Sequence, residues 1–361
     1  MSARTKDKYY LVSLGCSKNT VDSESMAQVL NASGMRGVGD PRSAEVLIVN
    51  TCGFIDSAKQ ESIDTLRELV DTRKRNQMVI AAGCLSQRYG ADLVQEVPGL
   101  DGVIGTRRWM DIFDLITRLR VRKHPEPLYH LPTDAAVVGL DERGVLRASV
   151  QGASAYLKIA DGCRRPCAFC AIPKIKGTAV SRPIQSIVNE AVQLEQMGVK
   201  EVMLIAQDTT DYGYDLGLKD GMAVLLDEIV KAAPGLRWIR VMYAYPGYVT
   251  PRLIETMAKH PQVLHYLDMP LQHGHRDTLL RMKRPPKSSG CMRRWRTCAA
   301  SCPTSRCARP SSSATPARRT RNSTGCSSLC ATSNSTAWAH SSTRMRSARR
   351  ARHCPIKCRM T

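Results

Sequence analysis

Short apolar runs alternate with amphipathic stretches in the first third of the chain. Tyr9–Leu14, Val46–Asn50 and Met78–Ala82 have the length and the aliphatic content of buried strands. Between them, Thr20–Ala32 and Ser57–Arg73 carry apolar residues at steps of three and four, which predicts helices. This alternation predicts an α/β fold in which a doubly wound parallel sheet has helices on both faces.

A second α/β unit follows a segment of different character. Residues 124–150 contain the helix-breaking sequence His-Pro-Glu-Pro and a charged turn that ends in glycine, so we expect a linker with room for a hairpin. Residues 151–286 return to apolar runs separated by amphipathic stretches. The expected strands are Ala155–Ala160, Val199–Asp208, Trp238–Pro246 and Leu264–Gln272, and the expected helices are Ser186–Met197, Gly221–Ala233 and Arg252–Lys259.

The pattern stops at residue 287. From there to residue 361, Leu329 and Ile356 are the only Leu, Ile, Val, Phe or Tyr residues. The same 75 residues hold 16 Lys and Arg and no Asp or Glu, so 16 of the 21 net positive charges belong to this tail. Two large aliphatic residues cannot bury enough surface to offset the entropy cost of ordering the backbone. An unstructured, low-complexity, basic tail is therefore predicted.

Three interpretations of this tail stay open. A shift of reading frame is favoured, because acidic and aliphatic residues vanish together while Arg, Ser, Ala, Pro and Cys become frequent. An acid-free, Arg-rich segment is also able to bind RNA phosphates without folding. Repeated C-x-x-x-C pairs, such as Cys298 with Cys302, leave a metal-binding module as the third interpretation.

Composition limits the class of protein. The 361 residues are 43% hydrophobic and 24% charged, as in globular proteins. No apolar run is long enough to cross a membrane, and Met1–Tyr10 is followed by no secretion signal, so we expect a cytoplasmic protein without a membrane partner. In a reducing compartment the 14 cysteines are predicted to be metal ligands or reactive thiols and not disulfides.

Three cysteines follow the predicted strands of the first sheet. Cys16, Cys52 and Cys84 each stand beside a glycine directly after a strand. The carboxyl ends of parallel strands meet at one edge of a sheet, so we expect the three thiols to share one site there. Three thiolates suit an iron–sulfur cluster that keeps one iron free of protein ligands, and the glycines would let the backbone approach it. The alternative is that each cysteine is a small buried apolar residue, but three at equivalent positions favour the cluster.

A second cysteine trio opens the second unit. Cys163, Cys167 and Cys170 have the spacing C-x-x-x-C-x-x-C, and the aromatic Phe169 precedes the last of them. This motif resembles that of the radical S-adenosylmethionine (SAM) superfamily. The resemblance implies a [4Fe-4S] cluster whose open iron binds SAM, within a partial (β/α) barrel. A structural zinc site would normally need a fourth ligand nearby, and the next cysteine is Cys291.

Polar residues near the predicted strand ends are candidate ligand contacts, because a barrel binds its ligands there. They are Gln207, Asp208 and Gln272, which together with Phe169 are the candidate cofactor-binding residues; each could equally be a capping or surface residue. The basic residues after the second trio could attract an acidic partner or form a solvated face; they are Lys174, Lys176 and Arg182.

A cysteine trio on an α/β domain, followed by a second cysteine trio at the start of a radical SAM barrel, resembles the methylthiotransferase family. The first domain (1–123) would hold an auxiliary cluster, and the incomplete barrel (151–286) would hold the radical SAM cluster. The similarity is carried by Ser13–Glu24, Asn50–Ile55, Ala82–Leu85, Gln207–Gly213 and Met269–Gly274. Within the family, Ser-Lys-Asn-Thr after Cys16 is similar to the RimO-like branch, which modifies a ribosomal protein, and differs from the Gln-Met-Asn usual in the transfer-RNA branch.

The resemblance implies an activity and its partners. The substrate would be an aspartate of ribosomal small-subunit protein uS12, modified at its β-carbon, and the cofactors would be two [4Fe-4S] clusters and SAM. A flavodoxin- or ferredoxin-like protein would supply electrons. Nucleic acid would be contacted through the ribosome or the basic tail alone. Two other functions stay open: modification of a transfer-RNA adenosine, and RNA binding through the tail without catalysis.

The resemblance ends after Met282-Lys283-Arg284. Relatives continue with two more barrel strands and a small C-terminal β-barrel, the TRAM domain, where this chain has its basic tail. A barrel that lacks two strands exposes an edge and part of its core. We therefore expect the second half to fold poorly and the activity to be weak or lost.

Overall fold

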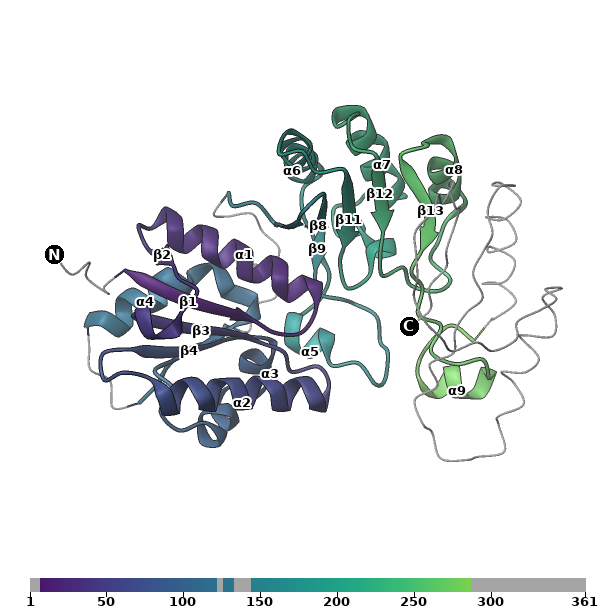
Figure 1. The fold of residues 1–361 in the computed structure, drawn as a ribbon. Coiled ribbons are helices and arrows are strands. Elements are labelled where there is room, and N and C mark those ends of the chain that lie inside the picture. The colour runs from purple at the N-terminus through teal and green to yellow at the C-terminus, as the bar shows by residue number, and fades with distance from the viewer. Residues whose placement is uncertain (1–6, 122–125, 133–143, 287–361) are drawn as a thin grey trace, which may run out of the picture.

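The computed structural model describes residues 7–121, 126–132 and 144–286, which form two α/β domains (Figure 1). The first contains a six-stranded parallel sheet in the order β2-β1-β3-β4-β5-β6. Its strands are β1 (Lys8–Ser13), β2 (Arg36–Gly37), β3 (Val46–Thr51), β4 (Met78–Gly83), β5 (Gly102–Gly105) and β6 (Leu128–His130). Its helices are α1 (Ser17–Ala32), α2 (Asp56–Thr72), α3 (Cys84–Glu96) and α4 (Ile112–Val121), with short 3₁₀ helices η1 (Pro41–Ser43) and η2 (Thr106–Asp111).

Both faces of this first sheet are buried. Val46 and Ile48 of β3 pack in one core with residues of α1 and α4, whereas Leu47 and Val49 pack in another core with residues of α2 and α3. A strand covered on both faces needs apolar residues on both sides, which is why the first four residues of β3, Val46–Val49, form a continuous apolar run. The predicted doubly wound parallel sheet is confirmed.

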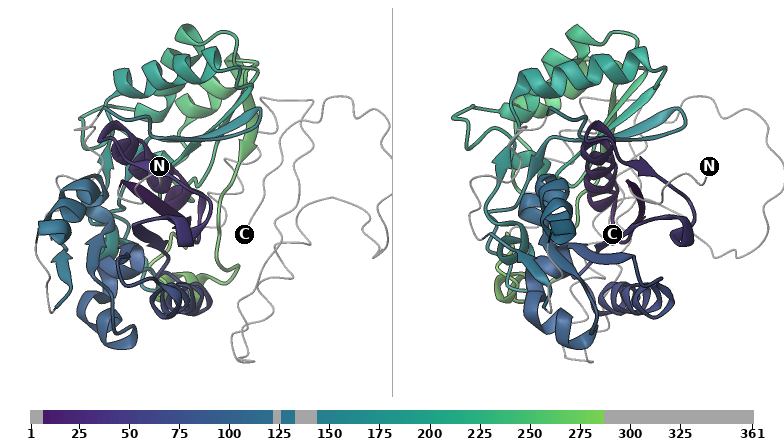
Figure 2. Two further views of the ribbon diagram at one scale, coloured as in Figure 1. Left: turned by 60° about the vertical axis from the view of Figure 1, so that its left-hand side comes forward. Right: turned by 90° about the vertical axis from the view of Figure 1, so that its left-hand side faces the viewer.

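The second domain is built on four parallel strands and one antiparallel strand. The sheet order is β13-β12-β11-β8-β7, and β7 pairs antiparallel with β8. The strands are β7 (Ala148–Gln151), β8 (Ser154–Lys158), β11 (Glu201–Ile205), β12 (Trp238–Val241) and β13 (Val263–Leu267). Helices α6 (Ile184–Gln196), α7 (Gly221–Ala232) and α8 (Pro251–Lys259) lie on the side of this sheet away from the first domain (Figure 2).

All four predicted strands of the second unit are present, and all four end earlier than expected. The chain leaves the sheet at Lys158, Ile205, Val241 and Leu267, and the polar segments that follow the last three are loops at the strand ends. Shorter elements complete the domain: the antiparallel pair β9 (Ala160–Asp161) and β10 (Val180–Ser181), with α5 (Ile172–Lys176), η3 (Thr209–Asp211) and α9 (Arg276–Arg281).

The segment expected to be a linker contributes to both sheets. β6 lies within residues 124–150 and pairs with β5, and β7 begins in the same segment. The expectations for the basic tail concern residues 287–361, which lie outside the described residues. Among the described residues, no helix is long and apolar enough to span a membrane.

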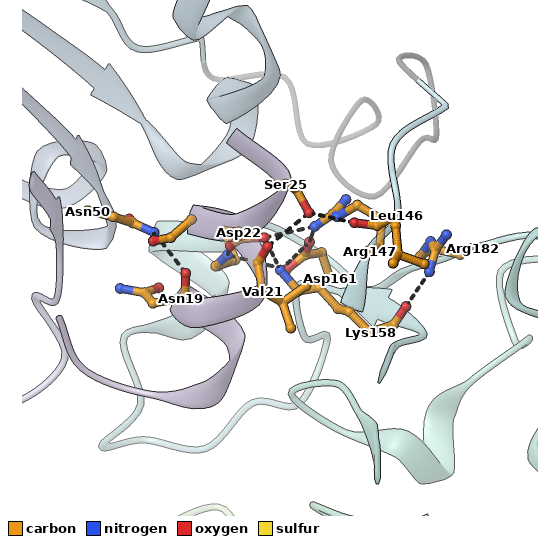
Figure 3. A network of polar contacts seen from close by, with 12 residues as sticks. Asn19, Val21, Asp22, Ser25, Asn50, Leu146, Arg147, Lys158, Asp161 and Arg182 are labelled. Atoms are coloured by element: carbon orange, nitrogen blue, oxygen red, sulfur yellow. Dashed lines mark hydrogen bonds and ion pairs between the residues drawn. The ribbon is translucent and has the colours of Figure 1, made fainter. Parts of the chain in front are cut away.

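A buried ionic network joins the two domains (Figure 3). Asp22 of α1 accepts from Arg147 at 2.8 Å, from Lys158 at 2.6 Å and from Lys176 at 2.9 Å. Asp161 lies 2.8 Å from Lys158 and 3.3 Å from Lys176. Each of these side chains is at most 2% exposed. Burial alone would raise the pKa of both carboxyls, but Lys158 and Lys176 hold the pKa of Asp22 and of Asp161 below its usual range.

The network corrects one expectation from the sequence. Lys176 was expected to face solvent or an acidic partner, yet it is buried against Asp22 and Asp161. Arg182 is buried as well and pairs with Glu190 at 2.6 Å. Lys174 remains exposed. A charge run read from sequence is assumed to be solvated, but carboxylates from distant segments neutralise two of these three cations.

Candidate functional site

The first cysteine trio lies at the edge of the first sheet that faces the second domain. Cys16 precedes α1, Cys52 follows β3, and Cys84 is the first residue of α3. Their strands β1, β3 and β4 are neighbours in the sheet, so the three cysteines follow adjacent strands, and their sharing of one cluster stays a prediction. Cys52 and Cys84 are buried, Cys16 is exposed, and all three are free thiols.

Asn19 links the three loops that carry these thiols. Its Nδ2 donates to the carbonyl of Leu14 and to that of Thr51, both at 3.0 Å. Its Oδ1 lies 3.7 Å from the Sγ of Cys84. Sequence reasoning did not single out Asn19, because an asparagine in the first turn of a helix is common and its partners lie on other strands.

The glycines beside the first trio have a different role from the one expected. A Cβ on Gly15 would lie 2.7 Å from the Cβ of Cys52, and one on Gly53 would lie 2.8 Å from the Cα of Leu85. A Cβ on Gly83 would lie 2.3 Å from the Oδ1 of Asn50. These glycines therefore let the strand ends approach one another, which brings the thiols together.

The second trio occupies the loop after β9. The backbone N–H of Cys163 donates to the carbonyl of Gly177 at 3.0 Å, and that of Cys170 donates to the carbonyl of Cys167 at 3.1 Å. The Sγ of Cys167 lies 3.6 Å from the hydroxyl of Tyr245 and 3.6 Å from Nη1 of Arg284. The Arg284 guanidinium also stacks 4.2 Å from the Tyr245 ring centroid.

Two arginines between the cysteines anchor this loop to the sheet. Arg164 donates to both carboxylate oxygens of Asp211 at 2.6 Å, and Arg165 donates to Asp208 at 2.6 Å. Bidentate arginine–carboxylate pairs fix orientation as well as distance. Asp208, a candidate cofactor contact in the sequence, thus has protein partners in Arg165 and Thr210.

The other candidate cofactor-binding residues differ in their surroundings. Phe169 is 49% exposed beside Cys170. The Oε1 of Gln207 is buried and has no hydrogen-bond partner within the part of the chain that the structure describes. Gln272 is exposed beyond β13 and has a left-handed backbone, with φ of 71°. Their roles in cofactor binding stay predictions.

The chemistry of both trios fits iron–sulfur clusters. The pKa of Cys84 and that of Cys163 are raised to about 11, mainly by burial and in part by neighbouring thiols of the same trio. Across residues 7–121, 126–132 and 144–286, no three His, Cys, Asp or Glu side chains converge closely enough to ligate a single metal ion. A cluster binds each thiolate through a different iron, so its ligands stand farther apart than those of one ion.

Lys18 of the first domain and Tyr243 of the second domain are in contact where the two domains meet. The Nζ of Lys18 is 3.1 Å from the centroid of the Tyr243 ring, and the hydroxyls of Ser17 and Tyr243 are 3.3 Å apart. Burial lowers the pKa of Lys18 to about 8, and Cys16 acts against this shift. Tyr243 follows β12, so the first turn of α1 touches the strand-end face of the second sheet.

Comparisons with known proteins agree with this architecture. The model of protein family UPF0004 matches residues 8–105, and that of the radical SAM superfamily matches residues 157–301. The chain is 46% identical over 296 residues to ribosomal protein uS12 methylthiotransferase RimO from a Roseiflexus species and 45% identical to RimO from Chloroflexus aurantiacus. The chain is thus similar to RimO proteins, and its second domain is similar to the radical SAM superfamily.

The alignments cover most of this RimO-like chain and a smaller share of its relatives. They include 78% and 79% of the chain but 62% and 65% of the two RimO proteins, so the chain spans less than two thirds of their length. Among solved structures, the radical SAM methyltransferase TsrM from Kitasatospora setae has a TM-score of 0.59 at 15% identity, over 82% of this chain and 66% of that one. At that identity, the likeness concerns the fold.

Proposed function

We propose that this chain is a radical SAM methylthiotransferase that adds a methylthio group to the β-carbon of an aspartate in ribosomal protein uS12. One observation carries the proposal: two trios of free cysteines lie on either side of a single domain junction. The identity of 42–46% to RimO proteins from several bacteria supports the substrate.

Each trio would hold one [4Fe-4S] cluster. Cys163, Cys167 and Cys170 would bind the radical SAM cluster, and the first trio would bind the auxiliary cluster. When bound, the groups supply the electron that cleaves SAM to a 5′-deoxyadenosyl radical and the sulfur that is transferred. A flavodoxin- or ferredoxin-like protein is the class of electron donor that this chemistry requires.

The chain's own residues prepare the site for this chemistry. Arg284 places a guanidinium nitrogen 3.6 Å from the Sγ of Cys167. Arg164 and Arg165 hold the cysteine loop on η3 through Asp211 and Asp208. The buried Oε1 of Gln207 is an acceptor available to a donor group of SAM.

Iron analysis tests the two cluster sites. After anaerobic reconstitution, we expect about eight irons per chain in the parent protein. A variant with alanine at all three positions of either trio should keep about four, because the trios lie in different domains. Cys291→Ala should not change the iron content. Loss of all iron in one triple variant while that protein remains folded would contradict two independent sites.

Mass spectrometry tests the substrate. The reconstituted protein, supplied with SAM, a reductant and a sulfide source, should add the mass of one methylthio group to a peptide of uS12 that contains the aspartate, in low yield because the family resemblance ends at Arg284. In a deletion strain, uS12 should lose that mass while the adenosines of transfer RNA are unchanged. A loss confined to transfer RNA would instead indicate the other branch of the family, and an iron-free protein would favour simple RNA binding.

A further inference from the structure

Lys18 is a cation held at the junction of the two domains. It lies in the first turn of α1, two residues after Cys16, and its Nζ is 3.1 Å from the Tyr243 ring centroid. The Tyr243 backbone has a φ of 60°, a conformation that costs on the order of 1 kcal/mol or more in a non-glycine residue. This strained backbone places the Tyr243 ring beneath Lys18, so the arrangement is maintained at an energetic cost.

The neighbouring lysines form ion pairs with carboxylates, whereas the ammonium group of Lys18 contacts the aromatic ring of Tyr243. Lys158 and Lys176 pair with Asp22 and Asp161, as the junction network requires. For Lys18, no carboxylate oxygen lies within 4.0 Å of Nζ among the described residues, although Asp268 is close enough to raise its pKa. A cation–π contact is worth roughly 0.5–2 kcal/mol and leaves the three ammonium donors free. An incoming anion would therefore find an unneutralised, partly desolvated ammonium group.

The position of Lys18 suits a substrate and not a structural partner. It touches the strand-end face of the second sheet through Tyr243 and stands beside Cys16 of the first trio. A side chain that loses a hydrogen atom to a radical formed at one site and gains a sulfur group from the other must enter between them. A carboxylate is the anion that an aspartate substrate carries, and its β-carbon is one bond away from it.

We propose that Lys18 binds the side-chain carboxylate of the substrate aspartate and so holds its β-carbon between the two cysteine trios. The inference rests on the proposed function and adds the residue that selects an acidic side chain. Adenine is uncharged at neutral pH, so the same lysine would offer a nucleobase no charge-assisted hydrogen bond. Lys18 is therefore a specificity residue for a carboxylate substrate.

A double-mutant cycle tests this contact in the full, reconstituted chain. Binding of a fluorescent uS12 peptide is measured by anisotropy for the parent protein and for Lys18→Met, with the peptide aspartate intact or replaced by asparagine. We expect either change alone to weaken binding at least tenfold. The two changes together should weaken it little further, because each removes the same contact. Lys18→Arg should restore most of the affinity, and Lys174→Met, on exposed α5, should have no effect.

Two further readouts separate the outcomes. Iron content and SAM cleavage without peptide should be unchanged in Lys18→Met, which shows that the clusters and the fold are intact. Two results would overturn the proposal for Lys18 while leaving methylthiolation by the parent protein intact. One is a peptide affinity that Lys18→Met does not change. The other is a loss of affinity in the doubly changed pair that equals the product of the two single losses. A parent protein that neither binds nor modifies the uS12 peptide would overturn the proposed function itself, and this inference with it.

Discussion

Gly83 and Gly34 have the same left-handed backbone but different surroundings. Their φ values are 98° and 84°, so an L-residue would strain either position. A Cβ on Gly83 would lie 2.3 Å from the Oδ1 of Asn50, whereas no atom lies within 4 Å of one on Gly34. At Gly83 the end of β4, which precedes Cys84, lies close to the end of β3, which precedes Cys52. At the residue scale, then, a hydrogen atom in place of a methyl group sets the geometry of the first trio.

Gly83→Ala should destabilise the protein more than Gly34→Ala. The backbone strain is common to both, and the additional clash should lower the free energy of unfolding by a further 1–3 kcal/mol or so, as overpacking does. Urea unfolding of the two variants measures the difference. Iron bound by the first trio should fall in Gly83→Ala and stay at the parental level in Gly34→Ala. Equal free energies of unfolding for the two variants would contradict the prediction, because they would show that the ends of β3 and β4 can move apart without cost.

At the scale of the element, β6 shows how a short strand is retained at the edge of a sheet. It has three residues, and His130 at its end lies 2.8 Å from Asp111 of η2. Arg108 also donates to Asp111, at 2.8 Å. Burial acts to raise the pKa of Asp111, but the hydrogen bonds from Arg108 and His130 lower it below its ordinary value of 3.8. A depressed carboxyl pKa means that the folded state favours the charged form.

This depression gives the protein a defined response to acid. The stabilisation by Asp111 is fully present above the unfolded-state pKa of about 4 and is lost as the pH falls through the lower folded-state value. Urea unfolding at pH 6 and pH 3 should show that Asp111→Asn costs about 1–2 kcal/mol at pH 6 and less at pH 3, where the carboxyl of the unfolded chain is largely protonated. Exposed Asp92 provides the control, since Asp92→Asn should have no comparable effect. An equal cost of Asp111→Asn at both pH values would contradict the charged contact.

The whole molecule depends on charges that neither domain neutralises alone. Asp22 belongs to the first domain, and its three cationic partners Arg147, Lys158 and Lys176 belong to the second. A buried ion pair adds little stability relative to apolar residues, but removal of one partner leaves an uncompensated charge. The network therefore fixes how the domains are placed, and with them the two trios.

Asp22→Asn should loosen the junction. We expect the free energy of unfolding to fall by about 3–5 kcal/mol, because the partner cations stay buried with less negative charge. Asp227→Asn is the control: Asp227 pairs with Arg252 and Lys259, which are 54% and 68% exposed, and with His260, so the cost there should stay well below that of Asp22→Asn. Chemical unfolding measures both variants, and similar small losses would show that the network does not hold the domains together.

Local pattern was sufficient to predict three strands of the first sheet and its parallel α/β character. Alternation of apolar runs with helical periodicity depends on neighbours in sequence, so β1, β3 and β4 were found with bounds within one residue of those observed. The position of Cys16, Cys52 and Cys84 after adjacent strands follows from the same rule. Short β5 and β6 were missed, because four and three residues carry too little pattern.

Tertiary structure alone decided which side chains meet. Ser17 and Tyr243 are 226 residues apart, and Asp22 and Lys176 are 154 apart, so no local pattern links them. The sequence suggested solvated cations at Lys176 and Arg182, and the fold buried both against carboxylates. Sequence by itself determined the strands, the helices and the two cysteine trios, since these follow from local periodicity and spacing. The partners of the buried charges, and the contact between Lys18 and Tyr243, exist only once the two domains pack together.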